Sequence, residues 1–211
     1  MTATRPRVGV LALQGDYARH REALERIGAE PVRVSMPTDL DGLEALVVPG
    51  GESTTMLRLL EATGLREPVE RFVRERPVLG TCAGLILLAR ESAGLPRPTF
   101  GALDVTVERN AYGRQVDSFS APIDTTIASG PVDGVFIRAP RIRAVGDGVE
   151  VVATLGGEPV GVRQGATVGL TFHPELTDDT RLHRWFLERV AGLVLPPAPG
   201  ANGADANGDA R

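Results

Sequence analysis

The chain has 211 residues, of which 42% are hydrophobic, and a formal net charge of −4 at pH 7. This length favours one large domain with a substantial core over two small domains. The acidic balance, with no basic block, argues against nucleic acid as a partner. One cysteine excludes an internal disulfide and a C-x-x-C zinc site. Neither a signal-peptide pattern nor an apolar run of membrane-spanning length is visible, so we expect a cytoplasmic protein without membrane contact.

The basic residues are unusual because all 23 are arginine. A Schiff base on lysine and a P-loop with its lysine are therefore both excluded. Arginine stays protonated, so these side chains can bind carboxylates or phosphates but are poor at proton transfer.

The first half of the chain alternates between two kinds of segment. Apolar runs typical of strands cover residues 7–13, 30–35, 43–51 and 77–81. Amphipathic segments typical of helices lie between and after them, at 16–29, 53–63, 65–75 and 83–92. This alternation predicts an α/β fold, a three-layer sandwich whose central sheet is mostly parallel.

The pattern changes after about residue 95. Short β-rich runs separated by glycine and proline predict hairpins and an antiparallel extension of the sheet. A last helix is expected over 178–195. Residues 196–211 are rich in Pro, Gly, Ala and Asn, which predicts a disordered tail after a single domain over 1–195.

The only cysteine, Cys82, lies in the G-x-C-x-G motif of Gly80–Gly84, where a predicted strand gives way to a helix. This is the cysteine counterpart of the nucleophile elbow, whose sharp turn demands small flanking residues. The dipole of the following helix favours thiolate over thiol. The alternative is a small buried hydrophobic residue, the usual fate of a free cysteine.

A nucleophilic cysteine needs a base and a group that orients the base. We interpret His20 and His183 as solvated, because they lie in amphipathic helices amid charged neighbours. His173 instead follows a buried-looking strand in "VGLTFHPEL". Extended geometry around Pro174 would turn His173 and Glu175 to the same side, which makes Cys82, His173 and Glu175 a candidate catalytic triad.

An oxyanion hole should accompany this triad. The backbone N–H of Ala83, directly after the nucleophile, is the expected first donor. The segment "VVPGGESTT" (47–55) leaves a strand with exposed glycine backbone, which makes Gly51 the expected second donor. An ordinary glycine-rich turn with a Ser/Thr helix cap explains this segment equally well.

Taken together, residues 7–194 resemble the class I (triad-type) glutamine amidotransferases. More closely, they resemble the glutaminase subunits of two-protein pyridoxal 5′-phosphate synthases. The likeness is carried by motifs in the family's order: "GVLALQGD", "PGGESTT", "GTCAGLILLA", "ERNAYGRQ", "FIRAP" and "FHPEL".

The resemblance implies that Cys82 attacks the side-chain amide of L-glutamine, releasing glutamate and ammonia, with His173 as acid and base. It implies glutamine binding by Gly51, Glu52, Ser53, Arg109, Ile137 and Arg138, and support of the oxyanion hole by Gln14. It also implies a heteromeric complex with a (β/α)₈-barrel synthase subunit that uses the ammonia for vitamin B6 biosynthesis. We expect no cofactor and no metal ion.

Three other functions remain open at this point. A cysteine hydrolase acting on peptides would share the elbow without needing "GGESTT" or paired arginines. A glutaminase for another pathway, such as imidazole glycerol phosphate synthesis, would differ mainly in its partner. A non-catalytic regulatory subunit would have no reason to keep all three triad residues.

Overall fold

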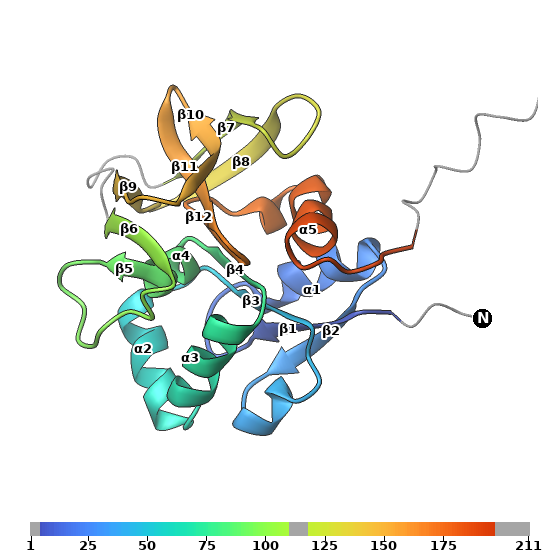
Figure 1. The fold of residues 1–211 in the computed structure, drawn as a ribbon, viewed down its shortest axis with the longest axis vertical. Coiled ribbons are helices and arrows are strands. Elements are labelled where there is room, and N and C mark those ends of the chain that lie inside the picture. The colour runs from blue at the N-terminus through green and yellow to red at the C-terminus, as the bar shows by residue number, and fades with distance from the viewer. Residues whose placement is uncertain (1–4, 110–117, 197–211) are drawn as a thin grey trace, which may run out of the picture.

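A nine-stranded sheet runs through the computed structural model of the protein, which describes residues 5–109 and 118–196 (Figure 1). Its strand order is β2-β1-β3-β4-β12-β11-β10-β7-β8. The first five of these are mutually parallel and the remaining four pair antiparallel. The strands are β1 (Arg7–Leu11), β2 (Glu30–Val34), β3 (Ala45–Val48), β4 (Val78–Thr81), β7 (Ser118–Thr125), β8 (Val132–Ile137), β10 (Glu150–Leu155), β11 (Glu158–Gln164) and β12 (Thr167–Leu170).

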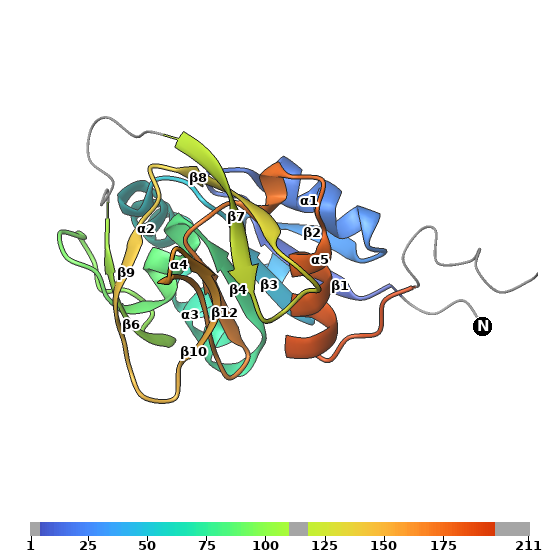
Figure 2. The ribbon, with the colours of Figure 1, turned by 90° about the horizontal axis from the view of Figure 1, so that it is seen from above.

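Helices cover both faces of the parallel part, which gives the predicted three layers (Figure 2). One face carries α2 (Ser53–Ala62), α3 (Arg66–Glu75) and α4 (Ala83–Leu88). The opposite face carries α1 (Tyr17–Arg26) and α5 (Arg181–Trp185), which continues into a π-helical turn, η3 (Phe186–Val190). Two short 3₁₀ helices, η1 (Pro37–Leu40) and η2 (Pro174–Leu176), complete the helical segments among the described residues.

Strand β3 shows how the sequence builds two cores at once. Its four residues are all fully buried. Ala45 and Val47 belong to the core under α1 and α5, whereas Leu46 and Val48 belong to the core under α2, α3 and α4. Alternate side chains of a strand point to opposite faces, so a continuous apolar run is what a strand covered on both faces requires.

The predicted antiparallel extension is also present. Strands β10 and β11 form a hairpin, as do β7 and β8. A separate three-stranded sheet has the order β5-β6-β9 and contains β5 (Ala89–Glu91), β6 (Leu103–Glu108) and β9 (Arg141–Val145).

Two predicted helices have the wrong boundaries. The helix expected over 83–92 ends at Leu88, because Ala89 turns extended and pairs with Leu103 in the small sheet. Tertiary strand pairing here overrides local helix propensity. The helix expected over 178–195 starts only at Arg181, because the side chain of Asp179 accepts a hydrogen bond from the Arg181 N–H and forms a turn before the helix.

The predicted tail lies almost wholly outside the described residues, which end at residue 196. Residues 110–115, the greater part of the motif "ERNAYGRQ", also lie outside them. No helix within residues 5–109 and 118–196 combines the length and apolar character needed to cross a bilayer.

Candidate active site

Cys82 occupies the predicted elbow between β4 and α4. Its backbone is held at φ 48° and ψ −103°, an uncommon conformation for a residue with a side chain. The flanking glycines are sterically required. A Cβ on Gly80 would lie 2.7 Å from the carbonyl carbon of Gly84, and one on Gly84 would lie 2.0 Å from the carbonyl oxygen of Val48. The elbow thus depends on both glycines of G-x-C-x-G.

His173 approaches the cysteine from the end of β12. Its backbone N–H donates to the carbonyl of Val135 on β8 at 2.8 Å, and the two residues form an isolated antiparallel bridge. Its Nδ1 lies 2.7 Å from Oε1 of Glu175. The contact forms as predicted but by a different route, because Glu175 belongs to the 3₁₀ helix η2 and not to an extended segment.

Burial and hydrogen bonding set the charges of this pair. Burial disfavours a charge on His173, but hydrogen bonds and charge interactions with Cys82 and Glu175 outweigh it and raise the pKa of His173 to about 10. Burial also disfavours charge on Glu175, yet the neighbouring His20 and His173 hold its pKa well below the usual carboxyl range. This arrangement favours an imidazolium between a carboxylate and a sulfur, a state in which the sulfur is nucleophilic.

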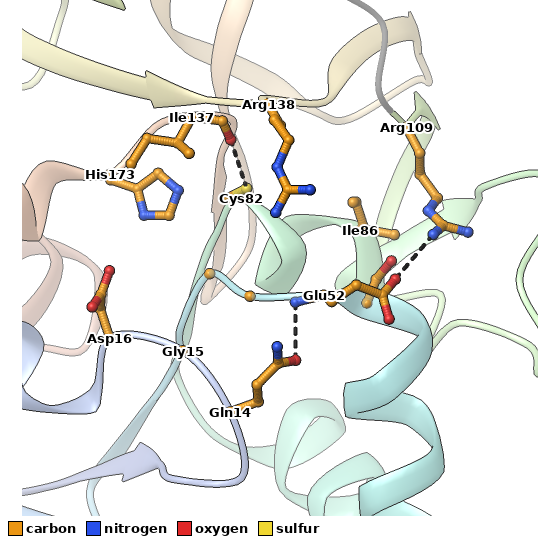
Figure 3. A pocket seen from close by; sticks show the side chains of 13 residues that line it. Gln14, Gly15, Asp16, Glu52, Cys82, Ile86, Arg109, Ile137, Arg138 and His173 are labelled. Carbon is orange, nitrogen blue, oxygen red and sulfur yellow. Dashed lines mark hydrogen bonds and ion pairs between the residues drawn. The ribbon is translucent and has the colours of Figure 1, made fainter. Parts of the chain in front are cut away.

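The sulfur faces a cavity of about 340 Å³, within the size range of small-molecule sites (Figure 3). It is lined by Gln14, Gly15, Asp16, Gly50, Gly51, Glu52, Ser53, Cys82, Ile86, Arg109, Ile137, Arg138 and His173. Every predicted glutamine-binding residue is in this set. Of the other predicted site residues, Glu175 lies behind His173, and Ala83 is buried as the first residue of α4.

Glu52 connects several predicted binding residues. Its carboxylate caps α2 by accepting hydrogen bonds from the backbone N–H groups of Thr54 and Thr55, and it pairs with Arg109 at 3.2 Å. Burial raises its pKa, but these hydrogen bonds outweigh that effect and lower the pKa to about 2. Its backbone N–H donates to Oε1 of Gln14 at 3.0 Å, so Gln14 is already attached to the glycine-rich turn.

Backbone strain among the described residues gathers at this cavity. Of the residues that the structure describes, only Cys82 (φ 48°) and Arg138 (φ 42°) have positive φ without being glycine, and both line the cavity. The two strained positions lie close together, since the Cys82 sulfur is 4.0 Å from the carbonyl oxygen of Ile137, the residue before Arg138. Such strain persists where the surrounding structure enforces it, commonly at functional sites.

Comparison with known proteins agrees with this geometry. A profile described as the SNO glutamine amidotransferase family matches residues 10–192. The chain belongs to that family. A relative from Thermus thermophilus, named pyridoxal 5′-phosphate synthase subunit PdxT, is 56% identical over 189 residues, which are 88% of this chain and 98% of the relative. The relative of the same name from Deinococcus radiodurans is 53% identical, covering 85% of this chain and 95% of the relative.

Solved structures extend the comparison. A crystal structure of a glutamine amidotransferase superposes with a TM-score of 0.82 at 52% identity, covering 88% of this chain and 99% of that one. PurLQS from Thermotoga maritima is only 19% identical but reaches a TM-score of 0.65, with 88% and 99% covered, and so shows the fold alone. The expected fold and the expected class of enzyme, a glutamine amidotransferase, are confirmed.

Two histidines of this amidotransferase are not where the sequence placed them. His20 and His183 were expected in solvent, but both are buried, at 0% and 1% exposure. The spacing of His20 to apolar residues further along the chain indicates this burial. His20 precedes the buried Leu24 by four residues, so both share one face of α1, and the buried Ile27 follows directly after the helix. The charged neighbours lie on other faces of the helix.

Asp16 was also missed by the sequence analysis. Although exposed, it lines the cavity, and its carboxylate can lie within 4.8 Å of the ligand atoms of His173 and Glu175. This trio is the group of residues in the described chain best placed to contact a cation. His173 and Glu175 already bond each other, however, and the expectation that no metal is needed stays a prediction.

Proposed function

We propose that the chain hydrolyses L-glutamine to glutamate and ammonia through a thioester on Cys82, and that the ammonia serves a pyridoxal 5′-phosphate synthase. The single observation that carries the proposal is the 2.7 Å contact between His173 and Glu175, buried beside the only cysteine in a family of glutamine amidotransferases. The name shared by the relatives supports the pathway.

The reaction starts with attack of the Cys82 sulfur on the side-chain carbonyl carbon of glutamine. Negative charge develops on the carbonyl oxygen, where the backbone N–H groups of Ala83 and Gly51 act as donors. His173 protonates the leaving nitrogen, the C–N bond breaks and ammonia departs. His173 then takes a proton from water, which cleaves the thioester to glutamate and regenerates the thiol.

The charges of the cavity suggest how the other end of glutamine binds. Arg109 is already paired with Glu52, whereas no carboxylate of the described residues forms an ion pair with Arg138. Arg138 therefore receives the α-carboxylate of glutamine, and Glu52 receives the α-ammonium group. Ser53 and Ile137, the other predicted glutamine-binding residues, also line the cavity.

A synthase subunit is the second part of the proposal. We propose that it is a (β/α)₈ barrel, that it forms a heteromeric complex with this chain in the cytoplasm, and that docking raises the glutaminase activity. The attachment of Gln14 to the glycine-rich turn supports a role for Gln14 in assembling the oxyanion hole. The domain over 1–195 contains every residue used in this mechanism.

The test is glutamate release from glutamine by the purified chain, alone and with the synthase subunit, for wild type and Cys82→Ala. We expect low activity alone, a rise with the partner, and loss of at least about 10³-fold in the variant. Partner-stimulated hydrolysis by Cys82→Ala would show that the nucleophile is wrong. If wild type hydrolyses no glutamine with the partner present, the chain acts on another substrate or only binds.

A further inference from the structure

Behind the cavity, the triad continues into a row of buried polar side chains. Glu175 of η2 is followed by His20 of α1 and then by His183 of α5, and the side chains of Glu175 and His20 have no solvent exposure. The Nε2 atom of His20 lies 3.3 Å from Oε1 of Glu175, and its Nδ1 lies 3.1 Å from Nε2 of His183. Nothing in the proposed reaction uses His20 or His183.

The ionised carboxylate of Glu175 is stabilised by its histidine neighbours. Its Oε1 contacts both His173 and His20, while its Oε2 has no hydrogen-bond partner in the part of the chain that the structure describes. A buried carboxylate is costly unless charged or hydrogen-bonding partners compensate for the lost water. Without His20, a single partner would remain, and that partner is the catalytic base itself.

The proton positions follow from these contacts. If Nε2 of His20 carried no proton, its lone pair would face the carboxylate oxygen of Glu175 at 3.3 Å, which is repulsive. A proton on Nε2 removes this repulsion and lies between two acceptors, Oε1 of Glu175 at 3.3 Å and Oγ1 of Thr81 at 3.2 Å. In the neutral form Nδ1 accepts, and Nε2 of His183 donates to it. His183 thus favours the tautomer of His20 that donates to Glu175.

The position of His20 is fixed by packing as well as by hydrogen bonds. Leu24, one turn further along α1, is fully buried in the core between α1, α5 and the sheet. Nε2 of His20 also lies 3.2 Å from Oγ1 of Thr81, the residue directly before Cys82. His20 therefore contacts both the carboxylate that orients the base and the strand end that carries the nucleophile.

We propose that His20 is a positioning residue of the triad, whose Nε2–H keeps Glu175 ionised and turned toward His173. The inference rests on the proposed function, because it deepens the role of the same triad. The charged or titratable groups near this row are His173, Asp16 beside the triad, and Arg26 and Asp179 beside His183.

Two substitutions of His20 distinguish the loss of its hydrogen-bond donor from a loss of packing. In His20→Gln the amide N–H₂ can occupy the place of Nε2 and still donate to Glu175. In His20→Asn the shorter side chain stays polar and can still meet His183, but it does not reach Glu175. Leu24→Ala is the matched control, since it loosens the same helix in the same core without touching the triad.

The measurement is the rate at which iodoacetamide alkylates the full-length chain, followed by intact mass from about pH 5 to pH 10. Since Cys82 is the only cysteine, every alkylation event reports on the nucleophile. Without His20, the negative charge on Glu175 is less stable. This weakens the support of an imidazolium on His173, and with it the stabilisation of negative charge on the Cys82 sulfur. We expect His20→Asn to move the half-maximal pH upward by about one unit, which slows the reaction by up to about tenfold at pH values below the wild-type midpoint. His20→Gln and Leu24→Ala should keep the wild-type midpoint.

Glutamate release with the synthase subunit gives a second readout. We expect kcat to fall about tenfold or more in His20→Asn, with KM for glutamine unchanged, because His20 does not line the cavity. His20→Gln should recover most of kcat.

The outcomes distinguish the two proposals. A wild-type alkylation profile in His20→Asn overturns the role of His20 and leaves the triad intact. Equal shifts in His20→Asn, His20→Gln and Leu24→Ala also overturn it, because loosened packing would then be the cause. If wild-type Cys82 reacts only in the pH range of an ordinary thiol, the ion pair is absent, and the triad proposal falls together with this inference.

Discussion

The two walls of the active-site cavity are built on different principles. The first, here the turn wall, comes from the loops that follow parallel strands β1, β3 and β4 and contains Gln14, Gly50–Ser53 and Cys82. The second, the hairpin wall, contains Ile137 and Arg138 at the end of β8, and His173, which is bridged to β8. The turn wall supplies the proposed nucleophile and exposed backbone, whereas the hairpin wall supplies the proposed base and the cation proposed to bind substrate.

This difference explains where sequence tolerance should lie. At Gly50 and Gly51 the turn wall needs residues without side chains, because its backbone must approach other atoms closely there. The hairpin wall needs particular side chains at particular places, with a strained backbone at Arg138. Substitutions should therefore fail for steric reasons at the glycines of the turn wall and for chemical reasons on the hairpin wall.

Among substitutions that leave Cys82 in place, the largest effect is expected from Gly50→Ala on the turn wall. An added Cβ would lie 2.3 Å from Cε1 of His173, so the imidazole must move away from Cys82. We expect partner-stimulated glutamate release to fall by about 10²-fold or more, because catalytic groups tolerate little displacement. Gly64→Ala controls for general destabilisation, since its φ of 71° strains an alanine although no atom lies within 4 Å of the added Cβ. Activity near wild type in Gly50→Ala would contradict the close contact of the two walls.

A smaller effect is expected from Arg138 on the hairpin wall. Arg138→Ala removes the proposed partner of the α-carboxylate, which should raise KM for glutamine by about 10- to 100-fold. Arg138→Gly loses the same charge but relieves the positive φ, so it should unfold at a higher temperature and be more stable than Arg138→Ala by about 1 kcal/mol. Equal stability of the two variants, measured by denaturant unfolding, would show that the backbone there carries no strain.

Arg109 should matter less than Arg138. Its ion pair with Glu52 is partly open to solvent, with 20% and 42% of the two side chains exposed, so the interaction is screened. Glu52 also keeps its hydrogen bonds from Thr54 and Thr55 without Arg109. We expect Arg109→Gln to raise KM by less than about fivefold, in line with a contribution of about 1 kcal/mol. An increase as large as that of Arg138→Ala would reassign the α-carboxylate to Arg109.

A clear effect on stability is expected from His183. Burial disfavours its charged form and lowers its pKa from 6.5 to about 3. The unfolded chain therefore binds the proton first, and folding stability is complete above about pH 6.5 and falls as the pH drops below it. Glu175 also loses stability in acid, but only below its unfolded pKa of 4.5.

The measurement is denaturant unfolding at pH 7 and pH 5 for wild type and His183→Leu. Wild type should lose about 2 kcal/mol more than the variant over this interval, at 1.36 kcal/mol per pKa unit. Parallel losses in the two proteins would mean that His183 does not titrate as its burial implies.

Much of the fold could be predicted because its signals are local. Each strand of the parallel sheet is a short apolar run, and glycine or proline marks most of its boundaries. The helix expected over 83–92 failed because the pairing of Ala89 with Leu103 is a contact between distant residues, which helical periodicity does not encode.

The residues that line the candidate site were predicted from motifs, but the burial, backbone strain and proton affinities of its side chains were not. The charged neighbours of His20 in the chain predict exposure, whereas its spacing to Leu24 places it on the buried face of α1. The strain at Arg138 could not be predicted either, because no glycine or asparagine marks that position. The proton affinities of His173 and Glu175 depend on distances that only the folded chain defines.

The bridge between Val135 and His173 has a mechanical consequence. Because the N–H of His173 is bound to β8, and Arg138 follows the last residue of β8, the proposed catalytic base and the proposed substrate anchor are attached to one hairpin. A displacement of that hairpin moves both groups as a unit relative to Cys82. Substrate affinity and proton transfer are thus coupled traits, and mutations in the β7–β8 hairpin should change KM and kcat together even when they touch neither residue.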